Sequence, residues 1–238
     1  MKQYNYLILF FIGIFLLFSV TLKAQVVVDG DVSEWGGKEK MQYDNENNLF
    51  YAFKKDNQFL YVSILKNKNA SKFDGGGVQV FFSQKKADTT GLQVVFANKI
   101  KNPDTNKSQK YTHDFFSVRN LNGVVSQQLP TNNETGILVE WKVTDIEYFV
   151  VRNSVLDEKA TPANPNIFTA EIQIPLEYLQ KYNLDKTIHF GIALRGLSYA
   201  FNIGPVAMNN GPKTVSQTEF WDQMTPTSFF GSIDLKTL

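Results

Sequence analysis

The sequence contains no cysteine and only two histidines among its 238 residues. Without cysteine no disulfide can stabilise the fold, and thiol nucleophiles and cysteine-ligated metal sites are excluded. His113 and His189 stand far apart in sequence with no evident set of partner ligands, so we interpret both as polar-face or loop residues. The 24 basic and 23 acidic side chains nearly cancel. A near-neutral chain gives no electrostatic reason to expect nucleic acid or an anionic membrane as a partner.

The familiar motifs of catalysis are also missing. The sequence has no Gly-x-Ser-x-Gly elbow, no glycine-rich phosphate loop and no His-x-x-x-His pair. Paired carboxylates for glycoside hydrolysis are defined by their separation in space, so the sequence leaves them open. We interpret Asp29, Asp74, Glu171 and Asp222 as turn or exposed-strand residues. We therefore expect a protein that is not an enzyme and that holds no metal.

The one long apolar run lies at the N-terminus. Tyr6 to Leu22 is almost entirely Leu, Ile and Phe, and Ala24-Gln25 then brings a small residue to a suitable cleavage point. This pattern predicts a secretory signal peptide over residues 1–24, cut near Ala24-Gln25, and hence an exported protein that is periplasmic, secreted or bound at the cell surface. The apolar run is longer than usual for a signal peptide, so an uncleaved anchor is the alternative. After cleavage we expect no membrane span.

Residues 25–238 are predicted to form a single all-β domain. No linker or repeat divides them, and short alternating runs separated by turn residues recur in place of any helical period. About ten or more such runs favour an antiparallel β-sandwich or jelly roll. The clearest run, Phe168 to Ile174, predicts a half-buried strand. Pro175 to Tyr182 predicts one short helix, because proline suits the first helical position.

A turn-forming stretch follows the leader, with the sequence Val-Val-Val-Asp-Gly-Asp-Val-Ser-Glu-Trp-Gly over residues 26–36. The valines favour a strand, and Asp-Gly-Asp predicts a turn in which Gly30 can adopt a positive φ at little steric cost. Asp29 or Asp31 can accept hydrogen bonds from the amides of this turn. A metal loop is the alternative, although calcium requires about six or seven oxygen ligands from a longer run. Trp35 is predicted to fill the end of the β core, with an indole N–H that needs an acceptor.

Two aromatic residues are predicted to lie in loops, where an exposed ring can stack on the apolar face of a sugar. Phe73 precedes Asp74 and three glycines at a loop-to-strand junction. Trp221, with Asp222 beside it, lies on the long polar approach to the last strand. The alternative is that both rings cap the open end of the sandwich. Trp141 ends a β run and is predicted to be packed in the core.

Five segments resemble, in order along the chain, motifs of family 9 carbohydrate-binding modules and their relatives. These segments are Val28–Trp35, Asn57–Val62, Gly77–Phe82, Phe168–Leu176 and Phe230–Leu235. The resemblance implies a β-sandwich that holds the end of a sugar between two aromatic rings. In this sequence the matching rings are Phe73 and Trp221, next to Asp74 and Asp222. The sequence departs from the family where Gln79 replaces a glutamate, and where a basic sugar-binding side chain is expected but residues 93–96 supply none.

The resemblance implies an exported, non-catalytic protein that binds a polysaccharide or an oligosaccharide. The alternative is a structural or interaction protein of the cell envelope that keeps the fold and binds another envelope protein. The absence of an attached catalytic domain favours this alternative, since such modules usually accompany an enzyme. A related group of sandwiches binds haem through Met with His or Lys. Met41, Met208 and Met224 supply candidate ligands, but nothing fixes a pair, and we expect no cofactor.

Overall fold

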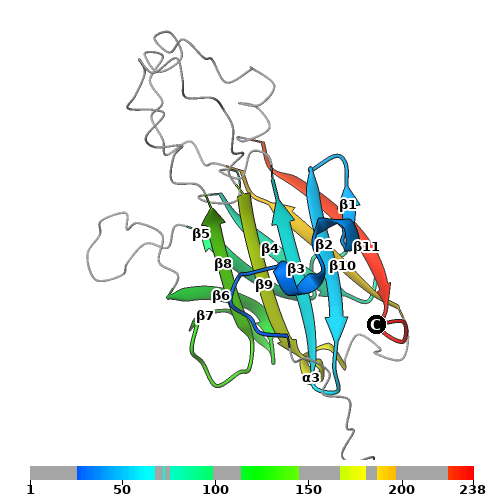
Figure 1. The fold of residues 1–238 in the computed structure, drawn as a ribbon. Coiled ribbons are helices and arrows are strands. Elements are labelled where there is room, and N and C mark those ends of the chain that lie inside the picture. Colours follow the sequence, from blue (N-terminus) through cyan, green and yellow to red (C-terminus); the bar gives the residue numbers. More distant parts are fainter. Residues whose placement is uncertain are drawn as a thin grey trace, which may run out of the picture.

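Two antiparallel β-sheets pack face to face in the computed structural model of this chain (Figure 1). The structure describes residues 26–67, 72, 76–98, 114–144, 167–180, 187–196 and 225–238. The five-stranded sheet has the order β1-β2-β3-β9-β8, and the six-stranded sheet has the order β11-β10-β4-β5-β6-β7. One α-helix lies within these ranges, together with two 3-10 turns. The prediction of an antiparallel β-sandwich with one short helix is confirmed.

The elements have the following bounds. The strands are β1 (Gln42–Asp44), β2 (Leu49–Lys55), β3 (Phe59–Lys66), β4 (Gly76–Ser83), β5 (Leu92–Asn98), β6 (Phe115–Leu121), β7 (Val124–Pro130), β8 (Leu138–Thr144), β9 (Ile167–Pro175), β10 (Thr187–Leu194) and β11 (Thr227–Asp234). The helical turns are η1 (Ser33–Trp35), η2 (Lys38–Lys40) and α3 (Leu176–Leu179).

The hydrophobic core lies between the two sheets, and alternation along the strands fills it. In β4 the alternating residues Val78, Val80 and Phe82 share one face and are fully buried in the core. Each such side chain contributes about 1.5–3 kcal/mol to folding by leaving water. Trp141 of β8 is buried as predicted, with its ring centroid 5.7 Å from that of Phe96 on β5. This aromatic contact joins the two sheets.

β2 and β3 form an antiparallel hairpin, and Asp56 holds its turn. One carboxylate oxygen of Asp56 accepts the backbone N–H groups of Gln58 and Phe59, each at 2.7 Å. The other oxygen accepts the hydroxyl of Tyr61 at 2.8 Å. A carboxylate that bonds the amides of its own turn is the usual reason for aspartate at such positions.

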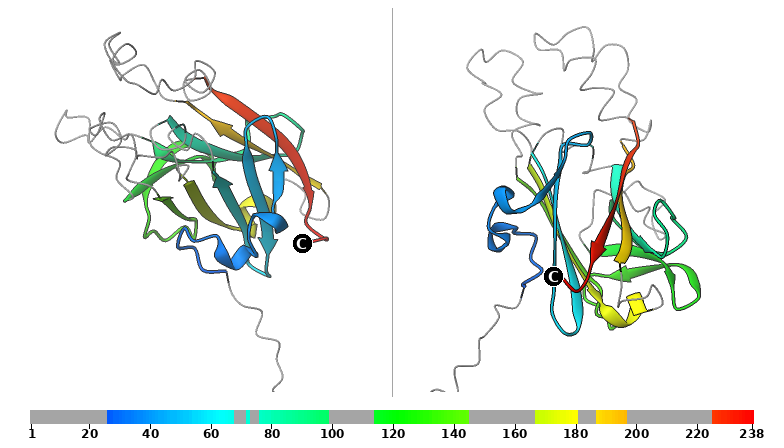
Figure 2. Two further views of the ribbon diagram at one scale, coloured as in Figure 1. Left: turned by 45° about the horizontal axis from the view of Figure 1, so that its top comes forward. Right: turned by 90° about the vertical axis from the view of Figure 1, so that its right-hand side faces the viewer.

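Residues 26–41 form a third layer across the outer face of the five-stranded sheet (Figure 2). Val32 and Trp35 pack there on Tyr61 of β3, in an apolar cluster separate from the main core. The prediction that Trp35 fills the end of the β core is therefore wrong. The outward-facing residues of β3 include Tyr61, and this apolar ring gives Trp35 a packing partner on the outside of the sheet.

This third layer also buries the outer face of β9. The strand is buried on both faces from Phe168 onward, and Glu171 is only 1% exposed. The predictions of a half-buried strand and of an exposed Glu171 are wrong, because residues 26–36 cover the face that alternation leaves to solvent.

Several residues of interest lie outside the described part of the chain. Neither the predicted leader nor the four predicted sugar-binding residues are described, and the same is true of His113, Met208 and Met224. Those four residues are Phe73, Asp74, Trp221 and Asp222. No helix in the described ranges combines the length and the hydropathy that a membrane crossing needs.

Candidate functional site

A buried carboxylate joins the third layer to the five-stranded sheet. One oxygen of Glu171 accepts the backbone N–H groups of Asp29 and Gly30, at 3.0 and 2.9 Å. The other oxygen accepts the indole N–H of Trp35 at 2.6 Å. The hydroxyl of Thr169, on the same strand, donates to the carbonyl of Gly30 at 2.7 Å. Four hydrogen bonds therefore hold the Asp-Gly turn and the tryptophan against β9.

The Asp-Gly-Asp turn is confirmed as a structural turn. Gly30 has a φ of 77°, which glycine adopts at little cost, and a Cβ at this position would lie 3.3 Å from the backbone of Trp141. Asp29 accepts the N–H of Asp31 at 2.7 Å, and Asp31 accepts the N–H of Ser33 at 2.9 Å. The backbone bond from Ser33 lowers the pKa of Asp31. These carboxylates are thus bonded to the amides of their own turn.

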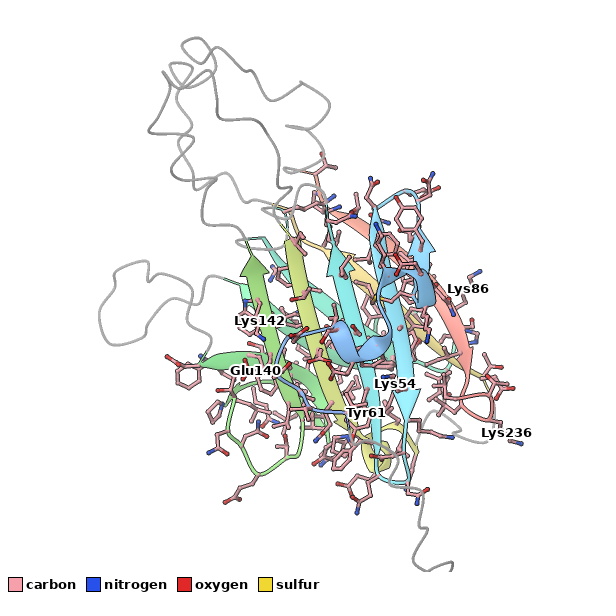
Figure 3. All side chains as sticks on the ribbon, in the orientation of Figure 1. Lys54, Tyr61, Lys86, Glu140, Lys142 and Lys236 are labelled. Carbon is pink, nitrogen blue, oxygen red and sulfur yellow. The ribbon has the colours of Figure 1, made fainter. Side chains whose placement is uncertain are left out.

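Burial gives Glu171 unusual electrostatics. Loss of hydration raises the pKa of its carboxyl group to about 7, and the nearby charge of Glu34 acts in the same direction. The hydrogen bonds from Trp35, Asp29 and Gly30 oppose this rise because they stabilise the ionised form. Lys54 of β2 also contacts Trp35, with its ammonium nitrogen 4.5 Å from the centroid of the indole ring (Figure 3). The Glu171 site is therefore a structural anchor.

A second arrangement lies at one end of the six-stranded sheet, where the strands next to the predicted aromatic residues meet. β10 ends at Leu194 and pairs with β4 on one side and with β11 on the other. β4 begins at Gly76, three positions after Phe73, and β11 begins at Thr227, six positions after Trp221. Two strand spacings, about 10 Å, separate β4 from β11. The described starts of β4 and β11 therefore lie at the same end of one sheet.

Glycines make close packing possible at this end. A Cβ on Gly76 would lie 2.2 Å from the carbonyl oxygen of Gly196, so no larger residue fits without moving the backbone. Gly77 has a φ of 87°, and its carbonyl accepts the N–H of Arg195 at 3.1 Å. The glycines after Asp74 therefore bring the start of β4 against the chain that leaves β10.

Two glutamines lie side by side on the outer face of the same sheet. The amide nitrogen of Gln79, on β4, donates to the side-chain oxygen of Gln93, on β5, at 2.7 Å. Gln93 in turn donates to the carbonyl of Thr89. Gln79 is half-buried, and amides of this kind donate to and accept from sugar hydroxyls. Sequence reasoning identified Gln79 as a departure from the family but missed its pairing with Gln93, which depends on strand register.

The two described residues considered as metal or haem ligands belong to different parts of the fold. His189 of β10 faces Ser232 of β11, with 2.7 Å between its Nδ1 and the serine hydroxyl. Met41 is buried just before β1 of the other sheet. Where the structure describes the chain, no group of three His, Asp or Glu side chains is placed to hold a metal ion.

Comparison with known proteins gives limited information. No family model matches the sequence, and no curated protein sequence matches it. A family 9 carbohydrate-binding module from Caldicellulosiruptor kristjanssonii, solved in complex with glucose, is similar to 72% of this chain over 74% of its own length. The sequence identity is 11% and the TM-score is 0.32. The similarity is weak and carries no functional inference.

Proposed function

We propose that this is an exported, non-catalytic protein that binds the end of a carbohydrate chain at the Gly76 end of the six-stranded sheet. Phe73 and Trp221 are the stacking rings in this proposal, and Asp74 and Asp222 bond the sugar hydroxyls. The observation that carries the proposal is the adjacency of β4, β10 and β11. This order puts the first residues of β4 and β11, Gly76 and Thr227, two strand spacings apart at one end of the sheet.

Chain reach supports the proposal. Three extended residues span at most about 11 Å and six span at most about 22 Å. Phe73 is three residues from Gly76, and Trp221 is six residues from Thr227. Both rings are therefore within reach of the space beyond β10, where a flat sugar ring can fit between two aromatic side chains.

The amides near this end of the sheet favour a ligand with many hydroxyl groups. Gln79 and Gln93 are uncharged and are already hydrogen-bonded to each other, which positions both amides on the outer face. Amides bond hydroxyl groups without requiring a charged partner. A glycan rich in hydroxyls is the ligand that these amides fit best.

The buried carboxylate supports the non-catalytic part of the proposal. A glycosidase needs two carboxyl groups that flank the scissile bond and can exchange protons with the substrate. Glu171 has a raised pKa, which is also a feature of catalytic acids, but its oxygens accept three N–H groups and it is covered by residues 26–36. Its raised pKa therefore follows from its structural role.

The test is a glycan-panel binding screen on protein that is produced with its own leader and recovered after export. The matched variants are Trp221→Ala and Tyr43→Ala, since Tyr43 is a 46%-exposed aromatic residue on the other sheet. We expect saturable glycan binding that Trp221→Ala abolishes at an unchanged thermal midpoint, while Tyr43→Ala binds like the wild type. The intact mass of the same sample tests cleavage near Ala24-Gln25, and its visible spectrum tests the expectation that no haem is bound.

Two results would contradict this proposal. If Trp221→Ala costs about 3–5 kcal/mol of stability, the ring is packed in the core instead of serving as a platform. If the folded wild type binds no glycan in the panel, the envelope alternative is favoured, and capture of a protein partner becomes the next experiment.

A further inference from the structure

The four edge strands of the two sheets differ in how they are protected from pairing with another chain. Natural edge strands are usually short, charged or covered, because their unpaired backbone groups can bind another strand. β1 has only three residues and ends in Asp44. β8 carries Glu140 and Lys142 (Figure 3). β7 has seven residues and no charge.

β7 is an ordered strand with an exposed apolar end. A two-residue turn at Asn122 and Gly123, with φ angles of 48° and 82°, joins it to β6 in the left-handed geometry that suits a tight hairpin. Leu129 packs against the core and fixes the far end. Val125 is nevertheless 79% exposed, and Val124 is 44% exposed. The hairpin thus holds a preformed, uncharged edge toward solvent.

We propose that β7 pairs antiparallel with the β7 strand of a second copy of this chain. If the twofold axis passes through Gln127, all seven residues of each strand pair. Val125 then lies opposite Leu129, Ser126 lies opposite Gln128, and Gln127 lies opposite its own copy. Apolar residues face apolar residues and polar residues face polar residues, which are the favourable cross-strand combinations. No like charges meet.

β11, the other long edge strand with little charge, is not complementary to its own copy in this way. When β11 is paired antiparallel with its own copy over its full length, Ser228 lies opposite Ile233 and Phe229 lies opposite Ser232. Its last residue, Asp234, also brings a charge to the edge. β11 is therefore not self-complementary, β1 is short and β8 carries charges, which leaves β7 as the long, uncharged and self-complementary strand among the described edges.

The β7 pairing joins the six-stranded sheets of two copies into one continuous sheet with twofold symmetry. One pair of seven-residue strands covers only the rim of each copy, which is less than the about 800 Å² per partner of a standard stable interface. The association is accordingly reversible and depends on protein concentration. It involves the opposite edge of the sheet from β11, so it is independent of the proposed sugar site.

The test is sedimentation velocity of the exported protein from micromolar to millimolar concentration, with two matched valine-to-lysine variants. Val125→Lys places a charge on the β7 edge. Val27→Lys places the same charge at a 62%-exposed valine on the third layer. We expect the average mass of the wild type and of Val27→Lys to rise from monomer toward dimer, while Val125→Lys stays monomeric with an unchanged thermal midpoint.

Hydrogen exchange provides a second measurement that does not depend on a variant. Amides of β7 that face the free edge should exchange more slowly as concentration rises, whereas those of β2, inside the other sheet, should not change. The proposal is overturned if the wild type is monomeric throughout, if Val125→Lys associates like Val27→Lys, or if the protection appears on another strand.

Discussion

The outer faces of the two sheets each carry a central polar side chain, and the two have different surroundings. Glu171 on β9 is covered by residues 26–36, accepts three N–H groups and is 1% exposed. Gln79 on β4 is half-buried and bonds Gln93, a neutral amide. Both side chains lie at polar positions of an alternating strand. The difference shows that alternation indicates which face a side chain lies on, whereas the covering segment decides whether that side chain stabilises the fold or remains available to a ligand.

The largest expected effect on stability comes from removing the Glu171 carboxylate. Glu171→Ala leaves the N–H groups of Asp29, Gly30 and Trp35 without their acceptor in a covered site, so we expect a loss of about 4 kcal/mol in the free energy of unfolding. Denaturant unfolding measures the loss. Glu177→Ala, a change at an exposed glutamate two residues after the end of the same strand, should stay within about 0.5 kcal/mol of the wild type. Equal effects of the two variants would show that the anchor does not hold the third layer.

The next effect is a dependence of stability on pH. The pKa of Glu171 rises on folding from its ordinary value of 4.5 to about 7, so the folded state binds a proton that the unfolded state releases between these values. The contribution of this proton to the free energy of unfolding is at its maximum below pH 4.5. It decreases as the pH rises through about 7, by about 3 kcal/mol in total. Thermal unfolding from pH 5 to about pH 8 measures the decrease. Glu171→Gln, which cannot ionise, should flatten the profile, and an unchanged slope in this variant would assign the effect to another group.

The smallest effect on stability is expected on the other face. Gln79→Ala removes one hydrogen bond from a half-buried site and should cost about 1 kcal/mol or less. If the amide binds a sugar hydroxyl, the same change should weaken glycan affinity by about tenfold, which corresponds to roughly 1.4 kcal/mol. Calorimetric titration against the glycan identified in the panel measures this. A large loss of stability with unchanged affinity would reverse the comparison and make Gln79 a structural residue.

Much of the fold was predictable because strand alternation is a local property of the sequence. The inward face of β4, the β2–β3 hairpin and the packed Trp141 all follow from spacing and turn chemistry. The placement of Trp35 and the burial of Glu171 could not be predicted in this way. Each depends on a contact between segments more than 130 residues apart, and the pattern of one strand carries no information about such a contact.

The candidate site was predictable only in part, for a related reason. The loop context in the sequence suggests Phe73 and Trp221, which stay a prediction, and strand order shows that the strands after them, β4 and β11, begin at one end of a sheet. The Gln79–Gln93 pair requires the register of β4 against β5, which alternation alone does not set. Neighbouring polar residues on adjacent strands therefore become visible as a pair only in the folded protein.

The hydrogen bonds between the Asp-Gly turn and Glu171 also limit how early this turn can dock on the sheet. The backbone amide of Asp29 and its acceptor are 142 residues apart in the chain. At about 5–20 residues per second, the ribosome completes β9 roughly 7–30 s after it has made the turn. The Asp-Gly turn, made early, can thus dock on Glu171 only after β9 has been made, when nearly three quarters of the chain is complete.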